Sequence, residues 1–319
     1  MTAKIYCTAP IPKAGPDLLT KQGMLVHVYD KDTAAPLSEI TEGLNDADAL
    51  ICLLSDPIDA KMINAAPRLK IIANYAVGYN NIDLQAARDK GIVVTNTPDV
   101  LTAATADLTW ALILAVSKRI PESERYLRQG QFFGWRPKLM LGGDVSGKTI
   151  GIVGAGRIGQ AVARRAVGFD MQVLYHSRNQ NIDFETSTPA KYVELDQLLQ
   201  ESDFISLHCP LSEETHYLIN AQNISIMKKG AYLINTARGP VVDEAALISA
   251  LESGHLAGAG FDVYEQEPVV PQSLLELDNV VLLPHIGSAT YETRDEMARI
   301  CALNIIEVLE GRPALTPVI

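Results

Sequence analysis

The chain has 319 residues, of which 47% are hydrophobic and 20% are charged, and its formal net charge is −11 at pH 7. This composition is typical of a globular protein with a sizeable core and excludes a disordered chain. The negative charge disfavours a general nucleic-acid or anionic-membrane surface, although a local basic pocket for one anionic ligand stays compatible with it.

The cysteines and the N-terminal segment point to an intracellular setting. The four cysteines form no CxxC pair, which favours reduced, mostly buried thiols over disulfides or a metal site. They are Cys7, Cys52, Cys209 and Cys301. The first residues show no secretory pattern, and no apolar run approaches the roughly 20 residues of a membrane span. We therefore expect a cytoplasmic protein without a metal, nucleic-acid or membrane partner.

Short apolar runs alternate with helix-like stretches in the first third of the chain, as in parallel α/β units. The predicted strands are Lys4–Thr8, Leu25–Tyr29, Ala49–Leu53, Lys70–Asn74 and Val93–Thr95. Leu101–Gln129 then reads as a long helical region, which Pro121 is expected to bend or restart.

A second α/β series follows, and it predicts a second parallel sheet. Its expected strands are Thr149–Val153, Gln172–Tyr175, Phe204–His208, Tyr232–Asn235, Ala259–Asp262 and Val280–Leu283. The last element, Tyr291–Leu309, is an amphipathic helix that Gly311 and Pro313 end. Periodicity alone does not decide on which sheet this helix packs.

A glycine-rich loop connects the first strand of the second series to a helix expected over Gln160–Val167. Its residues are Gly154, Ala155, Gly156, Arg157, Ile158 and Gly159, a GxGxxG pattern. In this context the glycines permit a tight turn, close approach of a pyrophosphate and close helix packing, and the helix N-terminus offers N–H groups to phosphates. The alternative is a plain strand–helix turn with incidental glycines.

The residue that reads the cofactor ribose is expected at the end of the next strand. Ser177 stands there, 18 positions after Gly159, followed by Arg178 and Asn179. A carboxylate would repel a 2′-phosphate, whereas serine does not, and an adjacent arginine can bind phosphate. We therefore predict that NADP(H) is preferred and NAD(H) possible. The alternative is an ordinary surface arginine that tolerates both cofactors.

Arg238, Glu267 and His285 each lie just past a predicted strand, at the edge where open α/β sheets bind ligands. Arg238 can hold a 2-keto acid, and His285 can protonate the developing alkoxide. Glu267 would orient the imidazole and raise its pKa. Singly, they could be a surface arginine, a loop acid and a structural histidine. His208 is a rival, read as lining the cofactor side because no acid follows it at a useful spacing.

From Asn74–Asp83 through the glycine loop to Pro284–Thr290, the chain resembles the D-2-hydroxyacid dehydrogenase family, and within it most of all the glyoxylate/hydroxypyruvate reductases. The resemblance implies that Arg238, Glu267 and His285 form the active site. It implies further substrate contacts at Leu54, Ser55, Ala76, Val77, Gly78 and Ser288. We add cofactor contacts at Cys209, Pro210, Thr215, Thr236, Ala237, Arg238, Asp262, His285 and Gly287.

The resemblance also implies two Rossmann-like or flavodoxin-like α/β domains with parallel sheets and an active-site cleft between them. The substrate domain would comprise residues 1–99 and 288–319, and the dinucleotide-binding domain residues 100–287. The family is typically dimeric through the region matching Leu101–Gly142. Trp135 is then a candidate interface residue, with a local core aromatic as the alternative.

These observations predict an NADPH-dependent reductase of small 2-keto acids, with glyoxylate and hydroxypyruvate first and glycolate and D-glycerate as products. Glu267 argues against formate oxidation, in which relatives replace the acid–histidine pair by glutamine–histidine. Two alternatives stay open: the same chemistry on D-lactate or a longer acid, and a dinucleotide-sensing corepressor or scaffold without catalysis. Retention of all three catalytic residues argues against the second.

Overall fold

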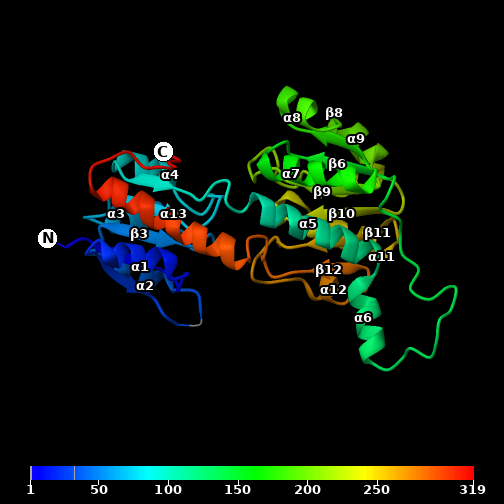
Figure 1. Cartoon of the computed structure of the whole chain (residues 1–319), viewed down its shortest axis with the longest axis horizontal. Coiled ribbons are helices and arrows are strands. Elements are labelled where there is room, and N and C mark those ends of the chain that lie inside the picture. Colours follow the sequence, from blue (N-terminus) through cyan, green and yellow to red (C-terminus); the bar gives the residue numbers. More distant parts are fainter. Residues whose placement is uncertain (1, 32) are drawn as a thin grey trace. The chain divides into compact units, whose positions relative to one another are not determined.

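The computed structural model describes residues 2–31 and 33–319. The chain forms two compact units. The first unit comprises Met1–Leu101 and Ser288–Ile319, and the second comprises Thr102–Gly287 (Figure 1). Each unit is a parallel sheet covered by helices.

The first unit contains a five-stranded sheet in the order β2-β1-β3-β4-β5, with every neighbouring pair parallel. Its strands are β1 (Lys4–Cys7), β2 (Leu25–Val28), β3 (Ala49–Cys52), β4 (Ile71–Asn74) and β5 (Val93–Thr95). The central strands β3 and β4 are buried along their whole length, as expected of a parallel sheet covered on both faces. This strand order is that of a flavodoxin-like doubly wound sheet.

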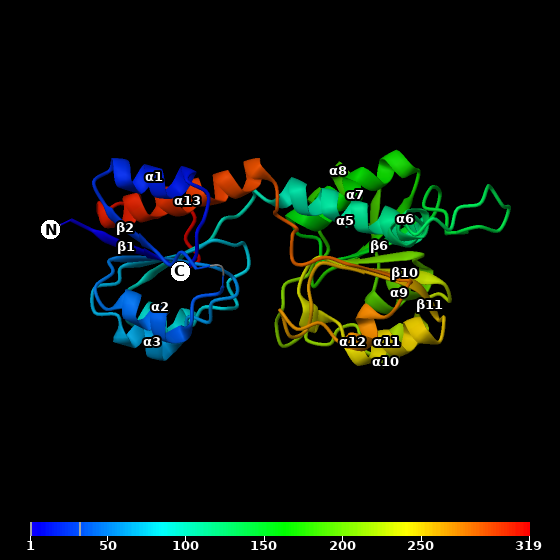
Figure 2. The ribbon, with the colours of Figure 1, turned by 90° about the horizontal axis from the view of Figure 1, so that it is seen from below.

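Helices cover both faces of the first sheet, with α1 and α13 on one face and α2 and α3 on the other (Figure 2). The helices of this unit are α1 (Ala14–Lys21), α2 (Leu37–Leu44), α3 (Ala60–Ala65), α4 (Leu84–Asp89) and α13 (Tyr291–Leu309). The closing helix α13 packs on α1 and β4, so the last segment of the chain belongs to the first sheet. Thr290 caps α13 by accepting a hydrogen bond from the Thr293 N–H.

The second unit contains a seven-stranded parallel sheet in the order β12-β11-β10-β9-β6-β7-β8. Its strands are β6 (Thr149–Val153), β7 (Gln172–His176), β8 (Ala190–Tyr192), β9 (Phe204–Leu207), β10 (Ala231–Asn235), β11 (Leu256–Phe261) and β12 (Val280–Leu282). The chain runs outward from β6 to β8, then returns to β9 on the other side of β6. This reversal between β6 and β9 is the topological switch point at which Rossmann sheets bind dinucleotides.

The helices of the second unit also form two layers, with α5 and α7 on one face of the sheet and α9 to α12 on the other (Figure 2). They are α5 (Thr102–Ser117), α6 (Ile120–Arg128), α7 (Arg157–Ala166), α8 (Ile182–Ser187), α9 (Leu195–Glu201), α10 (Ala221–Ile226), α11 (Glu244–Glu252) and α12 (Gln272–Leu275), with short 3-10 turns η1 (Val167–Phe169) and η2 (Gly239–Val241). Pro121 lies in the first turn of α6, so the long helical region restarts there as predicted.

The two-sheet α/β architecture confirms the fold class predicted from the sequence. The strand β8 was missed, because it is a three-residue edge strand that carries an exposed lysine. The helix α7 begins at Arg157 rather than at Gln160, so half of the glycine loop belongs to its first turn. No helix within the described residues is long and apolar enough to cross a membrane.

Candidate active site

The predicted catalytic and cofactor residues of the second unit all lie at the carboxyl edge of its sheet. They follow the strands β6, β7, β9, β10, β11 and β12. These six strands are neighbours in the sheet, although their order in the sheet differs from their order along the chain. Parallel strands end at the same edge, so residues far apart in sequence are gathered in one row of loops.

Glu267 and His285 are paired by a hydrogen bond of 2.8 Å between Glu267 Oε2 and His285 Nδ1. The other carboxylate oxygen of Glu267 accepts from the Tyr264 N–H at 3.0 Å. Burial alone would raise the pKa of Glu267. The hydrogen bond and the charge of His285 oppose burial, as do the Tyr264 N–H and the charge of Arg238, and together they bring the pKa of Glu267 below its usual value. Glu267 is therefore ionised at neutral pH.

An ionised carboxylate only accepts hydrogen bonds, so the proton of the pair must reside on Nδ1 of His285. The imidazole thus has a fixed tautomer, and its second nitrogen, Nε2, is the one that can exchange a proton with a substrate. The side chain of His285 is about one quarter exposed, which is compatible with that access.

Asp262 holds the main chain that follows His285 in place. This buried carboxylate accepts hydrogen bonds from the N–H groups of Ile286 and Gly287, both at 2.7 Å. His285 itself has a φ of 54°, in the left-handed region that non-glycine residues seldom adopt. The bonds to Asp262 stabilise this strained turn, which directs the imidazole towards Glu267.

Arg238 follows β10 and is half-buried. Asn235 organises this loop, since its side chain donates to the Arg238 carbonyl and accepts from the Ala237 N–H, both at 2.9 Å. Burial lowers the pKa of Arg238 and Glu267 opposes that effect, and an arginine keeps its proton in either case. The site therefore sets a fixed positive charge beside an ionised acid and a titratable imidazole.

Gly239 brings the Arg238 loop against the segment that carries Glu267. A Cβ atom at this glycine would lie 1.9 Å from the carbonyl carbon and oxygen of Tyr264, so no other residue fits without displacing that segment. Glu244, at the start of α11, accepts from the Glu265 N–H at 2.7 Å and fixes the same segment from the other side.

Helix α5 ties two of these loops to the body of the second unit. Thr109 shares a hydrogen bond of 3.0 Å with Thr236, and Thr105 donates to the Gly287 carbonyl at 3.1 Å. Thr236 and Gly287 flank Arg238 and His285, so the helix helps to fix their separation.

The rival histidine, His208, is unsuited to proton transfer near neutral pH. It follows β9, and burial lowers its pKa to about 3, so it is neutral. Its Nε2 is 2.8 Å from Ser206 Oγ. It lies beside the glycine loop, because a Cβ atom on Gly154 would lie 2.6 Å from the His208 carbonyl carbon.

The glycine-rich loop fits a dinucleotide. Gly154 has a φ of 107°, and a Cβ atom on Gly159 would lie 2.1 Å from the Gly154 carbonyl oxygen, so both positions require glycine. Gly156 caps α7, and a Cβ there would meet nothing within 4 Å, which leaves open space where a pyrophosphate would approach the helix N-terminus.

Ser177, Arg178 and Asn179 follow β7 at the same sheet edge. Ser177 Oγ donates to the Asn179 carbonyl at 2.7 Å, and the exposed Arg178 forms a loose ion pair of 3.7 Å with Glu214. After β9, the buried Cys209 and the exposed Pro210 are followed by Thr215, whose hydroxyl donates to the Pro210 carbonyl at 2.7 Å. The hydroxyl of Thr215 thereby closes the loop after β9.

In the first unit, the predicted substrate residues also follow strands at a carboxyl edge. Leu54 and Ser55 come after β3, and Ala76–Gly78 comes after β4, the neighbouring strand. Ser288 precedes α13, and its carbonyl accepts from Arg294 Nε at 3.2 Å.

The second unit matches a family model described as D-isomer specific 2-hydroxyacid dehydrogenase, NAD binding domain, over residues 110–287. The chain belongs to this family. A glyoxylate reductase of Thermococcus kodakarensis is 50% identical over 315 residues, covering 98% of this chain and 94% of the relative.

Solved structures agree with this membership. A protein from Thermus thermophilus has a TM-score of 0.94 at 46% identity, covering 99% of this chain and all of the other. An NADPH-dependent glyoxylate/hydroxypyruvate reductase from Sinorhizobium meliloti, solved with NADP and malonate, has a TM-score of 0.87 at 34% identity, covering 100% of this chain and 97% of the other. This 2-hydroxyacid dehydrogenase is therefore an NAD(P)-dependent oxidoreductase.

Several residues that organise the dehydrogenase site were missed in the sequence. Asn235 and Gly239 organise the Arg238 loop, and Glu244 and Tyr264 hold the segment that carries Glu267. Asn235 could have been recognised as a polar residue ending an apolar strand. The contact between Gly239 and Tyr264 depends on tertiary packing and leaves no local signal.

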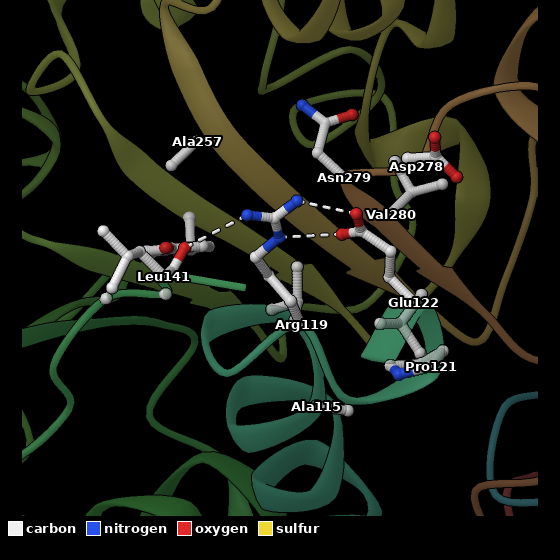
Figure 3. A pocket seen from close by; sticks show the side chains of 14 residues that line it. Ala115, Arg119, Pro121, Glu122, Leu141, Ala257, Asp278, Asn279 and Val280 are labelled. Carbon is white, nitrogen blue, oxygen red and sulfur yellow. Dashed lines mark hydrogen bonds and ion pairs between the residues drawn. The ribbon is translucent and has the colours of Figure 1, made fainter. Parts of the chain in front are cut away.

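A cavity of about 400 Å³ in the second unit lies away from these residues, between α5, α6 and the strands β11 and β12 (Figure 3). Arg119 crosses it and is held by Glu122 through a 2.6 Å ion pair and by the Leu141 carbonyl at 3.3 Å. None of the predicted catalytic or cofactor residues lines it.

Beyond this cavity, the segment between α6 and β6 exposes three aromatic side chains. Phe132 is 52% exposed, Phe133 is 88% exposed and Trp135 is 82% exposed. The alternative that Trp135 is a local core aromatic is therefore wrong.

Proposed function

We propose that this dehydrogenase reduces glyoxylate to glycolate and, by the same chemistry, hydroxypyruvate to D-glycerate. The observation that carries the proposal is the 2.8 Å pair of ionised Glu267 and His285 beside the charge of Arg238. The relatives named glyoxylate reductase, at up to 50% identity over nearly the whole chain, support the choice of substrate. A nicotinamide cofactor, when bound, would supply the hydride.

The substrate carboxylate is held by cationic and N–H donors. The planar guanidinium of Arg238 suits a 2-keto acid, since it donates to two oxygens at once. In the first unit, the main-chain N–H groups of Ala76–Gly78 are proposed donors to a carboxylate, and Leu54, Ser55 and Ser288 are proposed substrate contacts. A short acid such as glyoxylate needs no further side-chain contact.

His285 completes the reduction by giving its Nε2 proton to the carbonyl oxygen as the carbonyl carbon receives the hydride. The product is then a neutral hydroxyl and a neutral imidazole, which regains a proton from water. Glu267 stays ionised throughout and holds the imidazole in place by accepting a hydrogen bond from Nδ1. In the reverse direction, the neutral imidazole is the base.

We propose NADPH as the cofactor. The glycine loop and the first turn of α7 would hold the pyrophosphate, and Ser177 with Arg178 would favour NADPH over NADH. The loose 3.7 Å pair with Glu214 is between exposed side chains, so a 2′-phosphate can replace it at little cost. The rest of the dinucleotide would be contacted by Cys209, Pro210, Thr215, Thr236, Ala237 and Asp262.

Steady-state kcat/KM for glyoxylate, hydroxypyruvate, pyruvate and a longer keto acid, each with NADPH and with NADH, tests this proposal. We expect the highest value for glyoxylate with NADPH. A higher value for pyruvate or the longer acid would overturn the substrate assignment, and a preference for NADH would overturn the cofactor assignment. Tight NADPH binding without turnover of any acid would indicate a dinucleotide sensor instead.

We also infer a homodimer formed through residues 101–142. A contiguous set of exposed aromatic side chains in a single segment is typical of an interaction site, and Phe132, Phe133 and Trp135 form such a set. Sedimentation equilibrium should give the mass of two chains, and replacing Phe133 and Trp135 together by serine should shift it towards one. A wild-type monomer would contradict the inference.

A further inference from the structure

The loop after β4 has three consecutive main-chain carbonyls that are each held by a donor of the first unit. The Ala76 carbonyl accepts from the Thr97 N–H at 2.9 Å. The Val77 carbonyl accepts from the side-chain amide of Asn96 at 2.8 Å, and the Gly78 carbonyl from that of Asn74 at 2.6 Å. Two of the three donors are therefore asparagine side chains.

Because these carbonyls are held, the directions of the N–H groups in the same peptides are fixed as well. In a trans peptide the C=O of one residue and the N–H of the next point in opposite directions. The N–H groups of Val77, Gly78 and Tyr79 thus point away from the donors, and no hydrogen bond within the described part of the chain uses them. Successive N–H groups turned to one side form a concave site for an anion.

The two asparagines are themselves held in place. Asn74 is fully buried at the end of β4, where its Oδ1 accepts from the thiol of Cys52 at 3.6 Å. The main chain of Asn96 is bound to Thr316, whose hydroxyl donates to the Asn96 carbonyl at 2.6 Å. A neutral amide is required at both positions, because an ionised carboxylate would repel the loop carbonyls.

We propose that Asn74 and Asn96 are positioning residues for the substrate carboxylate, because they turn the loop N–H groups of Val77, Gly78 and Tyr79 outwards. This inference rests on the proposed function of the 76–78 loop. The two amides would act only through the loop, so they should affect the binding of carboxylates rather than hydride or proton transfer.

Asn96→Ala removes one donor from a half-buried side chain and is the first test. A net hydrogen bond is worth about 0.5–1.5 kcal/mol, so we expect KM for glyoxylate to rise by about 2–12-fold with kcat within about twofold. The dissociation constant of malonate for the NADPH complex, measured by calorimetry, should rise by the same factor. NADPH affinity should stay unchanged. Asn74→Ser, at the fully buried position, should show the same split.

Lys90→Met is the matched control. Lys90 donates to the carbonyls of Ile63, Asn64 and Ala66 at 3.0–3.2 Å in the same unit, but at the end of α3, before β4 begins. It should lower the melting temperature without changing KM or malonate affinity. If Asn96→Ala behaves like Lys90→Met, or lowers kcat and KM together, the inference is wrong. A wild-type protein without glyoxylate turnover would overturn the proposed function alone, since malonate affinity still tests the loop.

Discussion

The carboxyl edges of the two sheets are built from different chemistry. In the second unit, three ionisable side chains, Arg238, Glu267 and His285, follow three adjacent strands. In the first unit, the neutral amides of Asn74 and Asn96 hold main-chain carbonyls of the loop after β4 in place. We propose that the edge of the second sheet moves a proton and that the edge of the first sheet orients an anion.

The difference teaches that both edges depend on buried polar side chains which do not react. Asp262 holds the loop of His285. Asp56 does the same for the loop of Leu54 and Ser55: the Asp56 carboxylate accepts from the Leu53 N–H at 2.7 Å and from Thr8 Oγ1 at 2.5 Å. Burial raises the pKa of both aspartates, and the hydrogen bonds they accept oppose that effect. Burial of such groups is tolerated because each has its partners.

Arg238→Gln should give the largest loss. It removes up to two charge-assisted hydrogen bonds to the substrate, each worth about 1.5–3 kcal/mol, so kcat/KM for glyoxylate should fall by about 10² to 10⁴. The dissociation constant of NADPH, measured by fluorescence titration, should change far less. A loss below about tenfold would show that Arg238 is not the main anchor of the substrate carboxylate.

Glu267→Gln should come next, because it keeps the shape of the pair but removes the charge. The lost ionic hydrogen bond corresponds to about a 10–100-fold fall in kcat, measured at saturating glyoxylate. Glu265→Gln changes the same segment two residues away and should keep nearly full turnover. Equal losses in the two variants would mean that the segment, rather than the Glu267 charge, matters.

Gly239→Ala tests the packing between the Arg238 loop and the Glu267 segment. The new Cβ would lie 1.9 Å from Tyr264 main-chain atoms, so we expect about 1–3 kcal/mol of destabilisation in urea unfolding, together with reduced kcat. Gly168→Ala, where a Cβ meets nothing within 4 Å, is the control and should be neutral. An unperturbed Gly239→Ala variant would show that the two loops are not held by this contact.

His208 should make the stability of the fold depend on pH. The unfolded chain protonates this histidine below about pH 6.5, whereas the folded chain does so only near its pKa of about 3. Stability therefore falls as pH drops through this window, by at most about 1.4 kcal/mol per pH unit. His208→Asn should flatten the fall in unfolding free energy between about pH 6.5 and 5, measured by urea denaturation. An unchanged slope would show that His208 is protonated in the fold.

The sequence drew attention to the ionisable residues at the edge of the second sheet, but not to the amides of Asn74 and Asn96 in the first unit. Singly, Arg238, Glu267 and His285 could have structural roles, but their joint placement after three predicted strands, beside a dinucleotide loop, marks them as candidates. Asn74 ends a buried strand and Asn96 follows another, and nothing local shows that their amides point to carbonyls 4 and 19 residues away.

The strand β11 begins at Leu256, earlier than the predicted Ala259, because Gly258 weakens the strand pattern. A Cβ at Gly258 would lie 2.6 Å from the Asn279 carbonyl oxygen, so this glycine permits close packing of the chain. Such a contact joins residues that are distant in sequence, and the local pattern therefore does not reveal it.

We propose that His285 donates the proton for reduction of a 2-keto acid. The most direct test of this role is to measure kcat for glyoxylate with NADPH in the wild type and in His285→Gln, together with the NADPH affinity of both proteins. We expect kcat to fall by about 10² to 10⁴ in the variant while NADPH binds equally well. Near-normal turnover in His285→Gln would contradict it.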